Sequence, residues 1–227
     1  APGSGEDMLG LHALTAPPEA VLITEILLVC TALFSLFGGG AENRDQRAVL
    51  WAFGIVGVLS LGRVILGPIP NVQPVTIGLL LVGATYGARK GIGIAILVTV
   101  LSNIFLGTGI WTLFQAGAWS VIAVGGAVFT NHFIVNEKLI IGRLMVFGFI
   151  TAFIFDFLVS LSVLIADPTP SVFIAYLITG IPFDLLHAAG NMVISIILGP
   201  SMYSTLSRSL SSTNLKIRSV ANESRIE

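Results

Sequence analysis

Residues 63–76 read Arg-Val-Ile-Leu-Gly-Pro-Ile-Pro-Asn-Val-Gln-Pro-Val-Thr and interrupt a sequence that is otherwise built from apolar segments. The stretch holds three prolines, two side-chain amides and one arginine that lies well inside hydrophobic sequence. Proline fixes the backbone φ angle and removes a hydrogen-bond donor, so it favours a stiff turn over a continued helix. We therefore expect this stretch to line or gate a ligand site at one face of a membrane protein.

Composition supports the membrane assignment. Of the 227 residues, 55% are hydrophobic and 10% are charged, and the mean hydropathy is +0.95. A soluble domain carries about 25% charged residues. The net charge of −1 gives no indication of a nucleic-acid partner. Cys30 is the single cysteine, which excludes an intrachain disulfide and a cysteine-based metal site. No metal and no cofactor are expected.

Apolar segments of near-membrane length occur seven times in the chain. A helix needs about 20 apolar residues to cross the hydrocarbon core. The predicted fold is an all-α integral membrane protein, with a six-helix core over residues 48–200 and one additional N-terminal transmembrane helix. That additional helix lacks the basic flank of a signal peptide. The polar tails are residues 1–17 and 201–227. The predicted helices are 18–37, 48–66, 75–88, 91–107, 112–131, 143–166 and 172–198.

The distribution of Lys and Arg predicts the orientation. If the loop 38–47 is cytoplasmic, every basic residue except Arg63 lies on the cytoplasmic side. Positive charge concentrates on that side of membrane proteins. We therefore expect a multi-pass protein of the cell membrane, with its N-terminus outside and its C-terminus in the cytoplasm. Residues 63–76 then face outward.

One predicted helix is short. Residues 75–88 span about 21 Å at 1.5 Å per residue. Either the chain before this helix dips into the membrane beside a cavity, or the helix belongs to a tilted hairpin in a thin bilayer. Gly83, Gly87 and Gly91 recur every four residues, which predicts close packing of helix backbones.

Polar and aromatic residues at matching depth form a candidate substrate site near the outer face. Arg63 either binds a polar or anionic group, or it snorkels and ties the loop to its helix. Gln115 and Trp119 share a helical face. Thr76 also suits a helix cap, and Trp111 an interfacial aromatic belt. The candidate residues are Arg63, Asn71, Gln73, Thr76, Asn103, Trp111, Gln115 and Trp119.

A second polar group lies deeper, at Asp156, Asp184, His187 and Asn191. Ionisable groups inside membrane helices indicate functional sites. This group is either a proton relay or a hydrogen-bonded clamp between the last two helices, and we favour the clamp. No Ser or Cys nucleophile is paired with it in the sequence, and no His-Glu-x-x-His helix is present. We assign no catalytic residue and do not expect an enzyme.

Three motifs carry a family resemblance. They are Pro-Asn-Val-Gln-Pro-Val-Thr at 70–76, Leu-Ser-Asn-Ile-Phe-Leu-Gly-Thr-Gly-Ile-Trp-Thr-Leu-Phe-Gln at 101–115, and Gly-Ile-Pro-Phe-Asp-Leu-Leu-His-Ala-Ala-Gly-Asn at 180–191. Together they resemble the substrate-binding S component of energy-coupling factor (ECF) vitamin transporters, and the cobalamin-type subgroup in particular. The resemblance covers residues 48–200.

The resemblance implies a subunit that captures a micronutrient at the outer face. It also implies a transmembrane coupling subunit and two cytoplasmic ATPase subunits as partners, with Ala48 and Ala52 packing on the coupling subunit. The extra helix and Gly109-Ile110-Trp111, where the family often has Gly-Pro-Trp, depart from the pattern. Two alternatives remain open: a proton-coupled secondary transporter that uses the deeper polar group, and an intramembrane enzyme.

Overall fold

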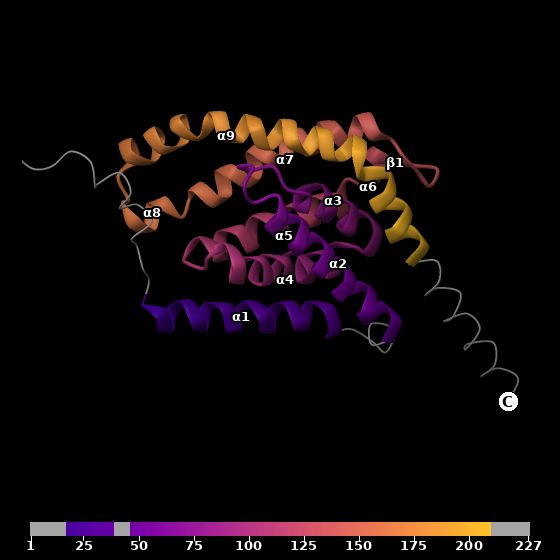
Figure 1. The fold of residues 1–227 in the computed structure, drawn as a ribbon, viewed down its shortest axis with the longest axis horizontal. Helices are drawn as coiled ribbons and strands as arrows, with labels where there is room; N and C mark the ends of the chain where they lie inside the picture. The colour runs from indigo at the N-terminus through magenta and orange to yellow at the C-terminus, as the bar shows by residue number, and fades with distance from the viewer. Residues whose placement is uncertain (1–16, 39–45, 210–227) are drawn as a thin grey trace, which may run out of the picture.

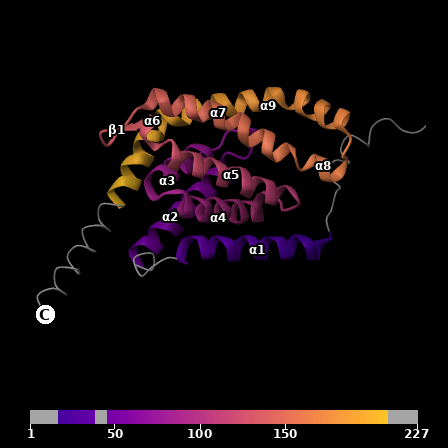
Figure 2. The same ribbon diagram turned by 180° about the vertical axis from the view of Figure 1, so that it is seen from behind.

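The computed structural model describes residues 17–38 and 46–209, and these are almost wholly helical (Figure 1, Figure 2). Most of the predicted tails 1–17 and 201–227 lies outside the described residues. A further helical stretch over residues 199–209 follows α9. The elements are α1 (Pro18–Phe37), α2 (Gln46–Ile65), α3 (Val75–Tyr86), α4 (Ala88–Leu106), α5 (Trp111–Val128), α6 (Thr130–Phe133), β1 (Ile134–Val135), β2 (Lys138–Leu139), α7 (Ile141–Ser160), α8 (Val163–Ala166) and α9 (Pro170–Ile197).

Long apolar helices make this an all-α protein of the membrane type. Each of the seven predicted segments coincides with a helix, except that the segment 143–166 divides into α7 and α8. Helix α3 is apolar but, with 12 residues, shorter than a full span, and the apolar part of α2 with described side chains is Val49–Ile65. The helices long and apolar enough to cross a membrane are Pro18–Phe37, Ala88–Leu106, Trp111–Val128, Ile141–Ile165 and Pro170–Ile197.

Helix α3 occupies the centre of the bundle. Every residue from Val75 to Gly83 is buried, and α3 contacts α2, α4, α5, α7 and α9. A helix that is hydrophobic on all sides is one that other helices enclose. Since α3 has only 12 residues, it is about 18 Å long and leaves the loop 66–74 to close the bundle at one end.

Glycines allow α3 and α5 to approach closely. A Cβ atom at Gly83 would overlap the carbonyl oxygen of Ala123, and one at Gly126 would overlap the carbonyl oxygen of Leu80. These contacts confirm the predicted backbone packing for Gly83. Gly87 does not share that role, because nothing lies within 4 Å of the place of its Cβ. Its φ of +84° instead allows the tight turn between α3 and α4.

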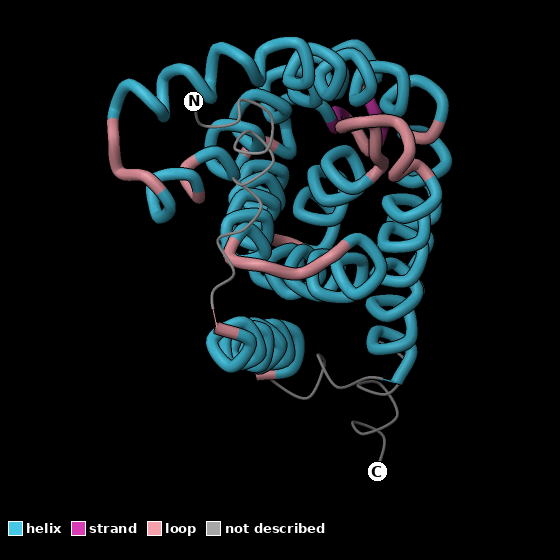
Figure 3. The backbone as a smooth tube through the Cα atoms, turned by 60° about the vertical axis from the view of Figure 1, so that its left-hand side comes forward, coloured by secondary structure: helices cyan, strands magenta, loops and turns pink. Residues whose placement is uncertain are grey.

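Helix α1 lies at the edge of the bundle and packs mainly on α4 (Figure 1, Figure 3). Its buried residues are Leu28, Ala32, Ser35 and Leu36. The Ser35 hydroxyl donates a 2.7 Å hydrogen bond to the Arg89 carbonyl. The other face of α1 is left exposed and apolar, as lipid contact requires.

The two ends of the bundle differ in charge. The loop 66–74 and the α7–α9 connection lie at one end, and the β1–β2 hairpin and residues 199–209 lie at the other (Figure 1). Apart from Arg63, the basic residues with described side chains belong to the hairpin end. They are Arg89, Lys90, Lys138, Arg143 and Arg208.

Candidate functional site

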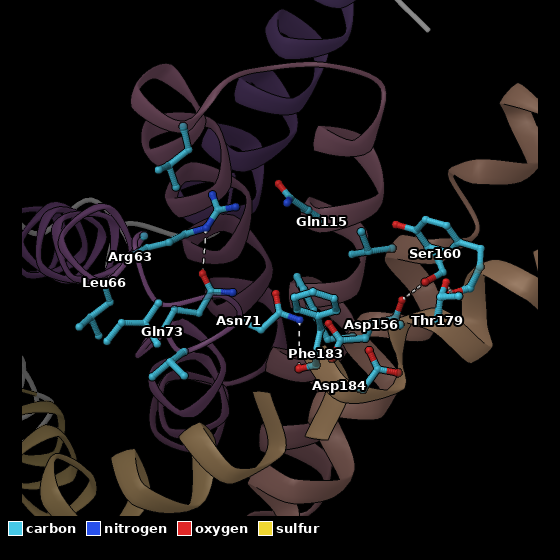
Figure 4. A pocket seen from close by; sticks show the side chains of 18 residues that line it. Arg63, Leu66, Asn71, Gln73, Gln115, Asp156, Ser160, Thr179, Phe183 and Asp184 are labelled. Atoms are coloured by element: carbon cyan, nitrogen blue, oxygen red, sulfur yellow. Dashed lines mark hydrogen bonds between the residues drawn. The ribbon is translucent and has the colours of Figure 1, made fainter. Parts of the chain in front are cut away.

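A cavity of about 430 Å³ lies beside the loop 66–74 (Figure 4). Its walls come from the end of α2, the loop, the end of α4, the start of α5, α7 and the first half of α9. Such a volume falls within the range of small-molecule pockets, which is about 300–1,000 Å³. Residues of both predicted polar groups line this one cavity: Arg63, Asn71, Gln73, Gln115, Asp156 and Asp184.

Arg63 is the centre of a buried hydrogen-bond network, and only 7% of the Arg63 residue is exposed. Its Nε donates to Gln73 Oε1 at 3.0 Å, and its Nη1 donates to Asn103 Oδ1 at 2.6 Å and to the Ser102 hydroxyl at 2.5 Å. The guanidinium carbon also lies 4.7 Å from the centre of the Trp119 ring. Within the described residues Arg63 has no acidic partner. Neutral dipoles and a ring face therefore stabilise its charge.

The network continues from α4 to α5 through Asn103. Its amide nitrogen donates to Thr112 Oγ1 and to Gln115 Oε1, both at 3.0 Å. Asn103 is 1% exposed and does not line the cavity, so it orients Arg63 and Gln115 instead of facing a ligand. Arg63 ties the loop to its helix through Gln73, as one reading expected, and it also lines the cavity, so that ligand binding by Arg63 stays a prediction.

Trp119 does not face the cavity. It is fully buried beneath Arg63 and stacks on Phe155, with ring centres 4.7 Å apart. The sequence places Trp119 among the candidate substrate-site residues, but in this structure its stacking partner Phe155 lines the cavity and Trp119 does not. Trp111 lies at the turn before α5, where its ring covers Gly109, and it also stands outside the lining.

Asn71 fastens the proline-rich loop to α9. Its amide nitrogen donates to the Phe183 carbonyl at 3.3 Å. Its φ of +58° lies in the left-handed region, which asparagine tolerates better than most residues. The second half of the loop that closes one side of the cavity is thus held at two points, by Gln73 to α2 and by Asn71 to α9.

Thr76, His187 and Asp156 form a hydrogen-bonded chain across α3, α9 and α7. Thr76 Oγ1 lies 3.1 Å from His187 Nε2, and His187 Nδ1 lies 2.9 Å from Asp156 Oδ2. The expected clamp between the last two helices is therefore present, and Thr76 is part of it. The order resembles a Ser-His-Asp triad, but its hydroxyl and imidazole are fully buried while the carboxylate faces the cavity. A substrate in the cavity would meet the carboxylate and not the hydroxyl.

Asn191 and Asp184 have different roles from His187. Asn191 is fully buried and donates to the Gly148 carbonyl at 3.0 Å, which adds a second link between α9 and α7. Asp184 lines the cavity and makes no hydrogen bond or ion pair within the described residues. Its carboxylate is thus available to a ligand. No group of three His, Cys, Asp or Glu side chains in the same residues could hold a metal ion.

Four lining positions on α9 are absent from the predicted site. They are Tyr176, Thr179, Gly180 and Phe183, with Ser160 facing them from α7. Together with Asp184 they follow the three- and four-residue spacing of one helical face. Extending that face by just over two turns before Asp184 would have found them in the sequence.

The predicted partner contacts at Ala48 and Ala52 are only partly described. The side chain of Ala48 lies outside the described residues, and Ala52 packs against the hydrophobic core. The small residues on the open face of α2 are instead Gly54 and Gly57, where nothing lies within 4 Å of the place of a Cβ atom.

A comparison with protein-family models matched residues 42–212 to a family of unknown function, DUF6580. Those residues include every wall of the cavity and leave out α1. Comparisons with curated proteins and with solved structures gave no match.

Proposed function

The chain belongs to the DUF6580 family, whose function is unknown, and from its cavity we propose that it is a substrate-capture subunit for a small polar micronutrient in a membrane transporter. One observation carries this proposal. Charged and amide side chains from α2, α5, α7 and α9 surround a cavity of about 430 Å³ in a bundle of apolar helices. Polar groups inside membrane helices are costly and mark substrate pathways.

The charge difference between the bundle ends supports an orientation. Basic side chains other than Arg63 lie at the hairpin end, away from the cavity. By the positive-inside rule the cavity opens to the outside of the cell membrane, with the N-terminus outside and the C-terminus in the cytoplasm. An outward cavity is suited to collecting a scarce nutrient.

The resemblance to ECF S components supplies the rest of the proposal. Helices α2 to α5, α7 and α9 would be the six-helix core, and α1 the additional helix. The sequence has no Gly-x-x-x-x-Gly-Lys-Ser/Thr loop. A coupling subunit and two ATPase subunits would therefore supply the energy. The open side of α2, around Gly54 and Gly57, is the surface on which we place the coupling subunit, since small residues allow close helix approach.

The size of the cavity indicates the size of the ligand. A volume of about 430 Å³ lies in the lower part of the range of small-molecule pockets, which is about 300–1,000 Å³. We therefore favour a vitamin or related nutrient smaller than cobalamin.

The proposal can be tested with a variant in which a larger side chain fills the cavity. Purified protein in lipid nanodiscs would be analysed by native mass spectrometry for a retained small molecule. Thr179→Trp places a ring in the cavity and should remove the bound mass. Ile178→Trp is the matched control, because Ile178 precedes it on the same helix, is 60% exposed and stands outside the lining. Equal bound mass in both variants and the wild type would contradict a ligand site here.

A proton-coupled secondary transporter is the second candidate, because Asp156 and Asp184 both line the cavity and His187 contacts Asp156. Such a chain of groups can carry a proton. The two candidates differ in their energy source. Uptake by the protein alone in proteoliposomes, driven by a proton gradient, would favour the second candidate. Uptake that requires co-reconstituted ATPase subunits would favour the first.

A further inference from the structure

The hydrogen bonds already made around the cavity leave donors on one side and acceptors on the other. This inference rests on the proposed function, because it concerns the ligand of the same cavity. Figure 4 shows Arg63 and the two carboxylates on opposite sides. We name the Arg63 side, with Gln73 and Gln115, the donor wall. The acceptor wall is Asp156, Ser160, Thr179 and Asp184.

On the donor wall, Arg63 decides the orientation of both amides. Arginine has no acceptor, so Gln73 must present its oxygen to Arg63 Nε, and Asn103 must present its oxygen to Nη1. The amide nitrogen of Asn103 then donates a hydrogen bond to Gln115, which must accept it with its side-chain oxygen. Both glutamines therefore keep an NH2 group that makes no hydrogen bond to the part of the chain that the structure describes. Arg63 Nη2 likewise makes no hydrogen bond within residues 17–38 and 46–209.

On the acceptor wall, the hydroxyl hydrogens are already used. Ser160 donates to the Asp156 carbonyl at 2.7 Å, and Thr179 donates to the Ala175 and Tyr176 carbonyls at 3.0 Å. Each hydroxyl oxygen can then only accept. Asp156 uses Oδ2 for His187 and leaves Oδ1 without a partner in the described chain, and Asp184 uses neither oxygen.

Aromatic rings reinforce the acceptor wall. Tyr176, Phe183 and Phe155 all line the cavity. An aromatic face attracts a cation within about 6 Å, most strongly where water is excluded. Carboxylates next to ring faces form a setting that suits an ammonium group and disfavours an anion.

From these two walls we propose that the ligand is a small zwitterion, with its ammonium group at Asp184 and Asp156 and its carboxylate at Arg63, Gln73 and Gln115. Arg63 and Asp184 are not paired with each other, so each keeps an uncompensated charge. A zwitterion compensates both charges at once, whereas an anion or a cation alone leaves one of them in an apolar bundle.

The charge of each wall can be tested by thiol labelling, and this test does not require the natural ligand to be identified. In a Cys30→Ser background, Leu66→Cys reports on the donor wall and Val159→Cys on the acceptor wall, since both residues line the cavity. The rates at which a cationic and an anionic methanethiosulfonate modify each cysteine would be compared. Each rate would be divided by the rate at which the same reagent reacts with 2-mercaptoethanol. We expect Val159→Cys to favour the cationic reagent about tenfold and Leu66→Cys the anionic one. Asp184→Asn should reduce the first preference to within about twofold.

Protection from labelling tests the zwitterion itself. The probes are 4-(aminomethyl)benzoate, benzylamine and 4-methylbenzoate, which match in shape and differ in charge. The zwitterion should protect both cysteines at a concentration about tenfold lower than either singly charged probe. Equal protection by all three probes, protection by none, or the same charge preference at both cysteines would overturn the zwitterion. Cysteines that no reagent reaches in folded protein, but that react after denaturation, would instead contradict an open cavity and with it the proposed function.

Discussion

Two buried polar networks meet at the cavity, and they handle charge differently. The Arg63 network surrounds one cation with the neutral side chains of Gln73, Ser102 and Asn103. The Thr76–His187–Asp156 chain pairs a carboxylate with an imidazole. The first keeps a net positive charge in the wall, whereas the second places a carboxylate beside an imidazole. Asp184, outside both networks, adds a further carboxylate on the second side. The cavity is polarised because the guanidinium and the carboxylates lie on opposite sides of it.

The largest expected effect comes from breaking both networks at once. Gly126→Leu would drive a side chain into the Leu80 carbonyl and separate α5 from α3, which supplies Thr76. We expect loss of folded, monodisperse protein, measured by size-exclusion chromatography in detergent. Gly125→Leu is the control, because nothing lies within 4 Å of the place of its Cβ atom. Similar yields for the two variants would show that the close approach is not required.

Removal of the cation should have the next largest effect. Arg63→Leu leaves Gln73 and Asn103 without their donor, and we expect it to lower the free energy of unfolding by about 3 kcal/mol. Thermal and denaturant unfolding in detergent would measure this loss. Arg208→Leu is the control, because within the described residues Arg208 bonds only to the Ser204 carbonyl of its own helix, and a change of about 0.5 kcal/mol is expected. A loss that small for Arg63→Leu would mean that its network contributes little.

In the second network the imidazole should matter more than the charge. His187→Leu removes the partner of both Thr76 and Asp156 and should cost about 2 kcal/mol. Asp156→Asn keeps an acceptor for the imidazole and should cost less than about 1 kcal/mol. Equilibrium unfolding of the two variants would measure the difference. If Asp156→Asn were the more damaging change, the ionic part of the pair would dominate.

A smaller effect than that of His187→Leu is expected in the loop between the networks. Asn71→Ala loses the bond to Phe183 and places alanine at a φ of +58°, with an expected cost of about 1–2 kcal/mol. Asn71→Gly loses the same bond without the backbone penalty. The difference in unfolding free energy between the two variants isolates the left-handed conformation. Equal stability would mean that the loop relaxes around alanine.

Much of the fold was predictable because it depends on local apolar length. The predicted segment 18–37 has the bounds of α1, and α2 at Gln46–Ile65 lies close to the predicted 48–66. The break at the prolines follows from the backbone of proline itself. The hydrogen bonds between α7 and α9 were also expected, because His187 and Asn191 share a helical face, but Asp184 from the same predicted group takes no part in them.

The union of the two polar groups in one cavity was not predictable. It depends on how α9 packs against α3 and α7, and the Thr76–His187 contact joins residues 111 positions apart. Helical spacing predicts which side chains share a face but not which face of another helix they meet. The burial of Trp119 has the same origin, because it depends on Arg63 and Phe155, which come from two other helices and pack against its ring.

The enclosed position of α3 has a consequence for how the protein is made. With 12 residues, α3 is about 18 Å long, well short of the roughly 30 Å hydrocarbon core, so it cannot be released into lipid as an independent span. Gly87 alone separates it from α4, which is 19 residues long. The two helices therefore have to enter the bilayer as one hairpin, and α3 reaches its final environment only when α5, α7 and α9, all synthesised later, close around it. The centre of the finished molecule is thus completed last.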